Sequence, residues 1–214
     1  MTKFTNARTI NRPNFIGILG EDGAGKSTVA GLIEETLYQA QPEHFLDTER
    51  QAFAGELKRM VHELDPILGA HVMGTRAEEI RLSDLLDDGY TEAEIKAKYP
   101  EYRRVLRDLG TKCLRSRDPN FWVDTFTEQH MTHMPDGLVL IADDVRFANE
   151  ADTIAWRTDL GRGAVIKVVG RGEGSGSGEQ IGTAHHDAII DNSGTLEETR
   201  AQIQEVLAHW GWKL

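Results

Sequence analysis

Short, continuous apolar runs alternate with longer amphipathic segments along this chain. Residues 14–19 (NFIGIL) form one such run, which stops at a glycine-rich stretch, and residues 138–142 (LVLIA) form another. Runs of this length and character are typical of strands buried on both faces of a parallel sheet. Two further runs predict strands at 164–169 and 188–190.

Apolar residues recur at helical spacing between and after these runs. The last predicted helix starts at Thr195, with Glu198 at the spacing of a capping box. This order of elements predicts an α/β fold with a mostly parallel sheet flanked by helices in three layers. The other helices are predicted from Lys26 onward, over about 50–64, 76–88 and 91–98, from Glu101, after Asp118-Pro119, and from the end of the 138–142 run to about 160.

The length of 214 residues fits one domain with a modest insertion. Residues 1–13 are polar and slightly basic, so we expect a flexible N-terminal tail followed by a single domain over 14–214. The charged helices at about 50–135 form the expected helical insertion. Residues 170–182 (GRGEGSGSGEQIG) predict a loop, because glycine and serine impose no preferred backbone state.

Charge and hydropathy narrow the classes of partner and compartment. The chain carries 24 basic and 35 acidic residues, a formal net charge of -11, so its average field repels nucleic acid and anionic membrane. No apolar run approaches the roughly 20 residues that cross a bilayer, and the start lacks the apolar core of a signal peptide. With one cysteine, Cys113, and so no internal disulfide, a cytoplasmic protein is expected.

Residues 20–27 (GEDGAGKS), here called the glycine-rich loop, match the pattern G-x-x-x-x-G-K-[ST] of P-loop NTPases. Glycines let successive N–H groups point into one concavity, and the start of a helix adds its positive dipole end. Lys26 should reach the β and γ phosphates of ATP, and the Ser27 hydroxyl should ligate Mg²⁺. The strand before the loop and the helix after it are the context that this motif requires. The residues expected to bind ATP here are Gly20, Asp22, Gly23, Ala24, Gly25, Lys26, Ser27 and Thr28.

The loop by itself does not separate GTPases, motor ATPases and small-molecule kinases. The chain has no Asn-Lys-x-Asp motif for reading guanine. Its predicted central strand ends in Asp-Val-Arg-Phe, where a GTPase has Asp-x-x-Gly, and its length leaves little room for the accessory domains of a motor.

Residues 144–150 (DVRFANE) resemble the Asp-Val-Arg-Phe-x-Asn-Glu motif of the bacteriophage deoxynucleoside monophosphate kinases. Residues 53–58 (FAGELK), 109–115 (LGTKCLR), 118–123 (DPNFWV) and 191–194 (DNSG) are similar to further segments of that family, in the same order. The resemblance spans about residues 14 to 200. It implies transfer of the γ-phosphoryl group of ATP to a deoxynucleoside monophosphate, a requirement for Mg²⁺, an acceptor site in the insertion and a possible homodimer.

The chain departs from the family pattern at three places. Gly55 replaces an aspartate, Arg107 stands where a glutamine is common, and residues 185–187 (HHD) replace a His-x-Ser-Glu segment. The first two fall where the resemblance places the acceptor, so the accepted bases stay open. Open alternatives are a thymidylate-only or dephospho-coenzyme A kinase, and an ATPase that acts through partners.

Three residues are the expected catalytic set: Lys26, Asp144 and Arg146. Asp144 could complete the Mg²⁺ shell or orient the acceptor, with Asp143 as a competitor and a helix N-cap as the structural alternative. Arg146 could bridge donor and acceptor phosphates, with an ion pair to Glu150 four residues on as the alternative.

Basic and aromatic residues complete the expected sites. Basic side chains must gather where a dianion binds to an acidic protein, although each of them could instead be a solvated helix charge. An aromatic residue could stack on the base or belong to the core. Arg171 is a candidate to cover the adenine, with an ordinary loop charge as the alternative. Zinc at His185 and His186 is rejected for lack of further ligands. The expected acceptor residues are Asp22, Phe53, Lys58, Arg103, Arg107, Arg115, Trp122, Arg146 and Glu150.

Overall fold

The computed structural model divides into two compact units, each with its own hydrophobic core. We call Met1–Phe53 together with Phe126–Leu214 the sheet unit, and Ala54–Thr125 the insertion unit. The insertion is thus a separate compact unit, with narrower limits than the expected 50–135. The residues that the structure describes are 2–5, 8–40, 47–73, 76–132, 134–156, 163–170 and 178–214.

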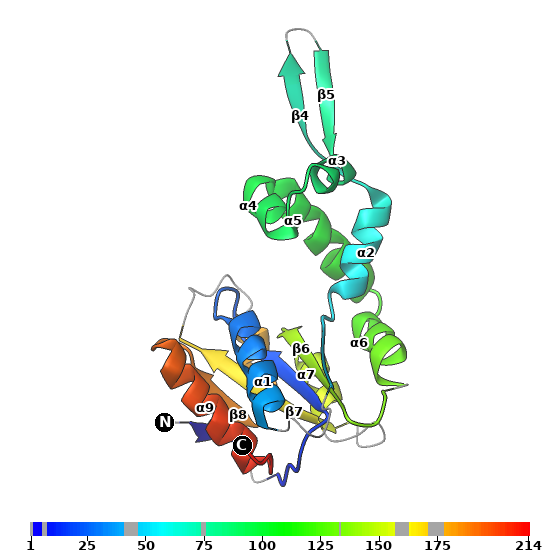
Figure 1. The fold of residues 1–214 in the computed structure, drawn as a ribbon. Coiled ribbons are helices and arrows are strands. Elements are labelled where there is room, and N and C mark those ends of the chain that lie inside the picture. Colours follow the sequence, from blue (N-terminus) through cyan, green and yellow to red (C-terminus); the bar gives the residue numbers. More distant parts are fainter. Residues whose placement is uncertain are drawn as a thin grey trace. The chain divides into compact units, whose positions relative to one another are not determined.

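The sheet unit contains a six-stranded sheet in the order β1-β8-β7-β2-β6-β3 (Figure 1). Five strands pair in parallel, and β1 joins β8 at one edge in antiparallel orientation. The carboxyl ends of the parallel strands therefore meet at one edge of the sheet. The strands are β1 (Lys3–Phe4), β2 (Phe15–Leu19), β3 (Asp47–Gln51), β6 (Leu138–Val145), β7 (Gly163–Val169) and β8 (Ala188–Asp191).

Helices cover both faces of this sheet. On one face, α1 (Lys26–Ala40) and α9 (Leu196–His209) enclose the main core with the inward side chains of the strands. On the other face lies α7 (Ala148–Trp156), so close to β2 that a Cβ on Gly17 would lie 2.4 Å from the Ile154 side chain. The helix α8 (Gly178–Thr183) packs beside α7. The expected α/β fold with a flanked, mostly parallel sheet is confirmed.

The insertion unit has a small core of its own, which includes the fully buried side chains of Val61, Leu82, Ile95 and Tyr102. It contains the expected helices and, in addition, an antiparallel hairpin that was not expected. The helix η1 continues α5 with π-type hydrogen bonding. The elements are α2 (Gly55–Leu64), β4 (Ile67–Met73), β5 (Arg76–Arg81), α3 (Leu82–Asp87), α4 (Glu92–Lys98), α5 (Pro100–Arg107), η1 (Asp108–Arg115) and α6 (Phe121–Phe126), and η2 (Thr127–Met131) returns the chain to the sheet unit.

The helix expected over 76–88 is correct only in its second half, because Arg76–Arg81 pairs with Ile67–Met73. The helix expected from about residue 50 begins later, since Asp47–Gln51 pairs with β6 as an edge strand. These two strands carry mostly exposed side chains, many of them charged, so neither has the apolar pattern that marks a strand in the sequence. The capping box at Thr195 is confirmed, with the Thr195 hydroxyl accepting from the Glu198 N–H.

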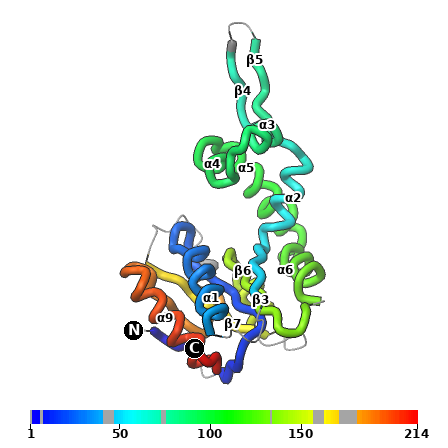
Figure 2. Tube along the Cα trace, in the orientation of Figure 1, coloured from blue at the N-terminus to red at the C-terminus, as the bar shows by residue number. Residues whose placement is uncertain are grey.

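The expected flexible tail over 1–13 contains ordered structure in its described residues. The Lys3–Phe4 strand pairs with β8, and Arg12 donates its N–H to the Trp210 carbonyl near the C-terminus. Both ends of the chain therefore lie on the α9 side of the sheet unit (Figure 2). The N-terminal segment is part of the fold.

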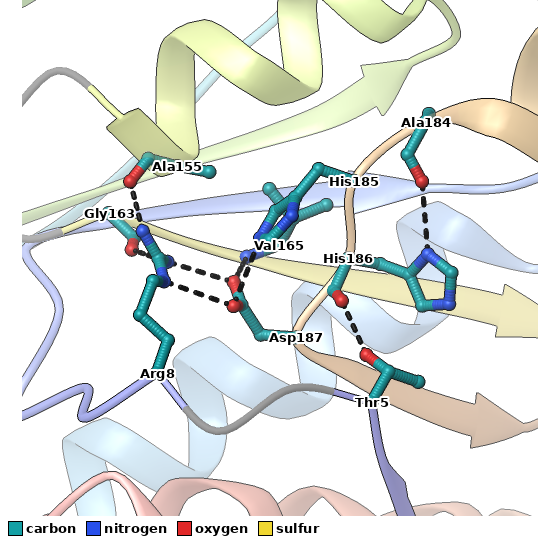
Figure 3. A network of polar contacts seen from close by, with 9 residues as sticks. All are labelled: Thr5, Arg8, Ala155, Gly163, Val165, Ala184, His185, His186 and Asp187. Atoms are coloured by element: carbon teal, nitrogen blue, oxygen red, sulfur yellow. Dashed lines mark hydrogen bonds and ion pairs between the residues drawn. The ribbon is translucent and has the colours of Figure 1, made fainter.

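A polar network fixes this segment at the amino ends of β7 and β8 (Figure 3). Asp187, whose side chain is 2% exposed, lies 3.0 Å from Arg8 Nη2 and accepts from the Val165 N–H at 2.8 Å. Arg8 Nη2 also donates to the Gly163 carbonyl at 2.7 Å, and Nη1 donates to the Ala155 carbonyl. One guanidinium thus links the N-terminal segment to α7, β7 and the start of β8.

Candidate functional site

The glycine-rich loop connects β2 to α1 at the carboxyl edge of the sheet. It is closed by a hydrogen bond of 3.2 Å from the Ala24 N–H to the Glu21 carbonyl. Gly23 and Gly25 have positive φ angles of 82° and 89°. Glycine adopts this conformation readily, whereas a residue with a side chain would be strained in it. The helix begins at Lys26, so the first-turn amides, which have no intrahelical acceptor, face the loop.

Ala24 anchors the loop to the core. Its side chain is 2% exposed and belongs to the core cluster under α1 and α9. The Ala24 side chain therefore has a structural role, and only the Ala24 main chain can contact a ligand.

Ser27 and Thr28 are exposed at the start of α1, as a ligand site requires.

Lys26 folds back over the loop. Its ammonium group donates to the carbonyls of Gly20, at 2.7 Å, and Glu21, at 2.9 Å. Burial lowers the pKa of Lys26, and the positive charge of Arg146 adds to this effect, while nearby carboxylates oppose it. A bound anion would therefore stabilise the charged form of Lys26.

A β-bulge lies at the acidic end of β6. Gly17 of β2 pairs with Ala142, whereas Leu19 pairs with Val145, so β6 has one extra residue in this interval. Ile141 belongs to the core under α1 and α9, but Val145 lies beside Gly17 on the face that α7 covers. Bulges of this kind redirect side chains, and they are common next to functional sites.

The bulge contains Asp143 and Asp144. Both carboxylates act on the pKa of Lys26, which places negative charge from both close to the loop. Asp144 Oδ1 also accepts the Phe53 N–H at 2.8 Å and so ties the end of β3 to β6. Asp144 is thus oriented by the Phe53 N–H, which follows β3, and the N-cap alternative for its side chain stays open.

Arg146 lies over the glycine-rich loop. Its Nη2 is 2.9 Å from Asp22 Oδ1, and both side chains are about half exposed. The alternative ion pair between Arg146 and Glu150 is not the arrangement found. Glu150 is 2% exposed, and its Oε2 accepts the main-chain N–H groups of Arg146, at 2.9 Å, and Phe147, at 3.1 Å.

Glu150 therefore has a supporting task. It is the third residue of α7 and satisfies main-chain donors just before the helix. The expectation that it contacts an acceptor directly is corrected, because its buried carboxylate faces the protein's own backbone. It holds the backbone that carries Arg146.

These groups fit a magnesium ion of the kind that accompanies a nucleotide. Mg²⁺ is usually held by one or two carboxylates together with water and substrate phosphates. Asp143, Asp144 and the Ser27 hydroxyl are donors of that type. Across the described part of the chain, no group of three or more His, Cys, Asp or Glu side chains could hold a metal ion by itself.

Phe53 and Trp122 are core residues, which corrects their assignment to an acceptor base. Phe53 is 4% exposed, and its ring stacks on Phe126 with a centroid distance of 4.2 Å. Trp122 is equally buried, and its indole Nε1 donates to the Gly110 carbonyl at 2.9 Å. Neither ring has a free face for a base.

Four basic residues of the expected acceptor site belong to the insertion unit. Lys58 pairs with Glu92 at 2.8 Å, and Arg103 Nε donates to the Lys96 carbonyl at 2.8 Å. Arg107 is largely exposed, with Nε at 3.8 Å from Asp108, and Arg115 is half-buried on η1. Their roles toward an acceptor stay predictions.

Two further expectations concern other parts of the chain. Arg171 lies outside the described residues. His185 Nε2 lies 3.1 Å from Asp187 Oδ1, and His186 Nδ1 lies 3.1 Å from the Ala184 carbonyl, so both belong to the network of Figure 3.

Sequence reasoning missed three residues beside the loop. Arg50 of β3 pairs with Glu34 of α1, and its Nη1 is 3.5 Å from the Ser27 carbonyl. Asn192 and Thr199 form a buried pair behind the loop. Residues 191–194 were noted only for their similarity to a family segment, and nothing in the local sequence marks Thr199.

Comparison with known proteins does not extend this picture, since no family model and no curated protein matches the chain. No helix in the described residues is long and apolar enough to cross a membrane.

Proposed function

We propose that this chain is a P-loop kinase that transfers the γ-phosphoryl group of ATP to a deoxynucleoside monophosphate. One observation carries the proposal: the glycine-rich loop with Lys26 follows a buried parallel strand, and the acidic bulge and Arg146 lie beside it at the same edge of the sheet. Ligands of open parallel sheets bind at this edge. The proposal includes a P-loop NTPase fold for the sheet unit.

The loop would bind the phosphates of ATP through its amides and Lys26. In the structure Lys26 donates to two carbonyls of its own loop. A phosphate offers the Lys26 ammonium an acceptor of opposite charge in their place, and the attraction between the two charges adds to the hydrogen bond. The lowered pKa of Lys26 points the same way, because an anion restores its charge.

Asp143, Asp144 and Ser27 would hold Mg²⁺, which offsets negative charge on the phosphates when bound. The tie between Asp144 and the Phe53 N–H keeps this carboxylate in one orientation. Ordered second contacts of this type fix the direction of a ligand group.

Arg146 would bind the transferring group. During transfer the bond from the γ-phosphorus to the β–γ bridging oxygen breaks, and a bond from it to an oxygen of the acceptor phosphate forms. ADP leaves with the electron pair of the broken bond. A planar guanidinium binds two oxygens at once, and Glu150 fixes the backbone that presents it.

A deoxynucleoside monophosphate as acceptor rests on the resemblance of residues 144–150 and of four further segments to the phage kinases. It is supported by the basic side chains of the insertion unit, in a chain whose net charge is -11. An acidic protein binds a dianion only where basic groups gather.

The test is direct. The purified protein is incubated with Mg·ATP and each of dAMP, dCMP, dGMP and dTMP, and the products are separated by chromatography. We expect diphosphates from at least two acceptors, no diphosphate with Lys26→Ala, and full activity with Lys213→Ala, an exposed lysine near the C-terminus. ATP hydrolysis that no monophosphate alters would overturn the kinase proposal in favour of an ATPase.

A further inference from the structure

Asn192 is a fully buried polar residue that reaches the glycine-rich loop from the end of β8. It is 1% exposed. Its N–H donates to the Val169 carbonyl of β7 at 2.8 Å, and its side-chain Nδ2 donates to the Ala24 carbonyl of the loop at 2.9 Å. The residue therefore joins the sheet to the loop.

Thr199 fixes the orientation of this amide. Its side chain is buried in the first turns of α9, with Oγ1 at 3.0 Å from Asn192 Oδ1 and 3.1 Å from the Thr195 carbonyl. The Ala24 carbonyl can only accept, so the NH₂ group of Asn192 must face it. The oxygen of Asn192 then faces the Thr199 hydroxyl, which donates.

Gly25 lies directly against Asn192. A Cβ at Gly25 would lie 2.1 Å from Asn192 Nδ2, and the φ angle of Gly25 is 89°. The loop thus approaches Asn192 as closely as an unsubstituted backbone allows. A contact this close constrains the loop as well as the amide.

The bond to Ala24 sets the direction of a neighbouring amide. In a trans peptide the C=O and the following N–H point in opposite directions within one plane. Because the Ala24 carbonyl points at Asn192, the Gly25 N–H points away from it. An anion cradle depends on such amide directions.

We infer that Asn192, held by Thr199, is a positioning residue for the glycine-rich loop, which sets the direction of the Gly25 N–H and thereby the affinity for the phosphates of a nucleotide. The nucleotide part of the inference rests on the proposed function. The structural part concerns the nucleotide-free chain and is testable without any ligand.

The first experiment measures hydrogen–deuterium exchange of residues 20–27 in the nucleotide-free protein. Removing one buried hydrogen bond should speed exchange there by about tenfold in Asn192→Ala. Thr199→Val, which deletes only the hydroxyl, should act in the same direction, and Thr199→Ser should restore wild-type exchange. The control is Thr36→Val, which removes a buried hydroxyl that bonds within α1, away from the loop.

The second experiment separates positioning from general stability. We expect Asn192→Ala and Thr199→Val to raise KM for ATP about tenfold and to leave KM for the monophosphate within about twofold. Thr199→Val should lower Tm no more than Thr36→Val does, since each variant deletes one buried hydroxyl. Thr199→Ser should return KM for ATP to the wild-type value. Equal rises in both KM values would overturn the inference.

The outcomes distinguish the two proposals. If the wild type forms no diphosphate but the variants loosen residues 20–27, the proposed function fails and the positioning role stands. If the wild type is a kinase and the variants change neither exchange nor KM for ATP, the positioning role is refuted and the function stands.

Discussion

The Arg146 guanidinium and the Asp22 carboxylate lie 2.9 Å apart, so the residue that would contact the transferring phosphoryl group is paired with the loop that would hold the donor. Both side chains are about half exposed. Exposed pairs of this kind contribute about 0–1 kcal/mol to stability. A phosphate can therefore replace Asp22 at small cost.

Arg146→Gln should reduce kcat by about 10³-fold, because an arginine that offsets charge in phosphoryl transfer is worth at least that much. Arg146→Lys keeps the charge but loses the bidentate fork, so we expect an intermediate loss. Steady-state kinetics with saturating ATP and monophosphate give the values. A fully active Arg146→Gln would exclude the assigned role.

Asp22→Asn should leave Tm nearly unchanged, because the exposed pair with Arg146 contributes little to stability.

Gly25→Ala should weaken binding of ATP by at least about tenfold and destabilise the sheet unit by about 1–3 kcal/mol. The reason is the positive φ angle together with the 2.1 Å approach to Asn192. Calorimetric titration and urea unfolding measure the two effects. Gly182→Ala is the matched control, since a Cβ there meets nothing within 4 Å. Equal behaviour of the two variants would contradict the expectation.

Asp187→Asn should lower the free energy of unfolding by about 1–3 kcal/mol, because it weakens the charged bonds to Arg8 inside the protein. The site lies at the amino ends of β7 and β8, away from the glycine-rich loop, so catalytic constants should stay unchanged. Denaturant unfolding tests this. Arg12→Ala, on the same N-terminal segment but with an exposed bond to Gly211, should cost less.

The pKa of His130 is lowered, chiefly by burial, while the charge of Glu49 opposes the shift. The unfolded chain therefore binds a proton at this residue at higher pH than the folded chain does. Above the ordinary pKa of 6.5, titration of His130 does not reduce the free energy of unfolding. As the pH falls from 6.5 to the folded-state pKa, the free energy of unfolding decreases. Urea midpoints at about pH 8 and pH 5 should differ less in His130→Gln than in the wild type. An unchanged difference would argue against this burial effect.

Much of the sheet follows from local pattern. Most residues of the strands β2, β6 and β7 are buried, so apolar residues dominate each of them, and the short strand β8 is apolar in its first three residues. The edge strand β3 (DTERQ) and the hairpin strand β5 (RAEEIR) lack that pattern, because exposed strands need no apolar face. The partner of β3 is β6, about 90 residues further along the chain, so the local sequence of β3 does not indicate this pairing. The partner of β5 is the neighbouring strand β4, but the charged sequence of β5 lacks the alternation that would mark a strand.

The candidate site divides in the same way. Lys26, Ser27 and Arg146 stand in short motifs whose chemistry is local, so sequence reasoning finds them. The bulge at Asp143 and Asp144 depends on the register between β2 and β6, which no single segment encodes. For Phe53 and Trp122 the sequence predicted a site role that the structure does not support. Both residues stand within matching motifs, yet both side chains are buried in the protein.

The stacked rings of Phe53 and Phe126 lie at the two points where the chain leaves and re-enters the sheet unit. Since these points touch, a short linker can span them without stretching either strand. The 54–125 segment can therefore change in length and sequence while the sheet and the glycine-rich loop stay as they are. Under the proposed function, such an exchange would alter the acceptor and leave ATP binding unchanged.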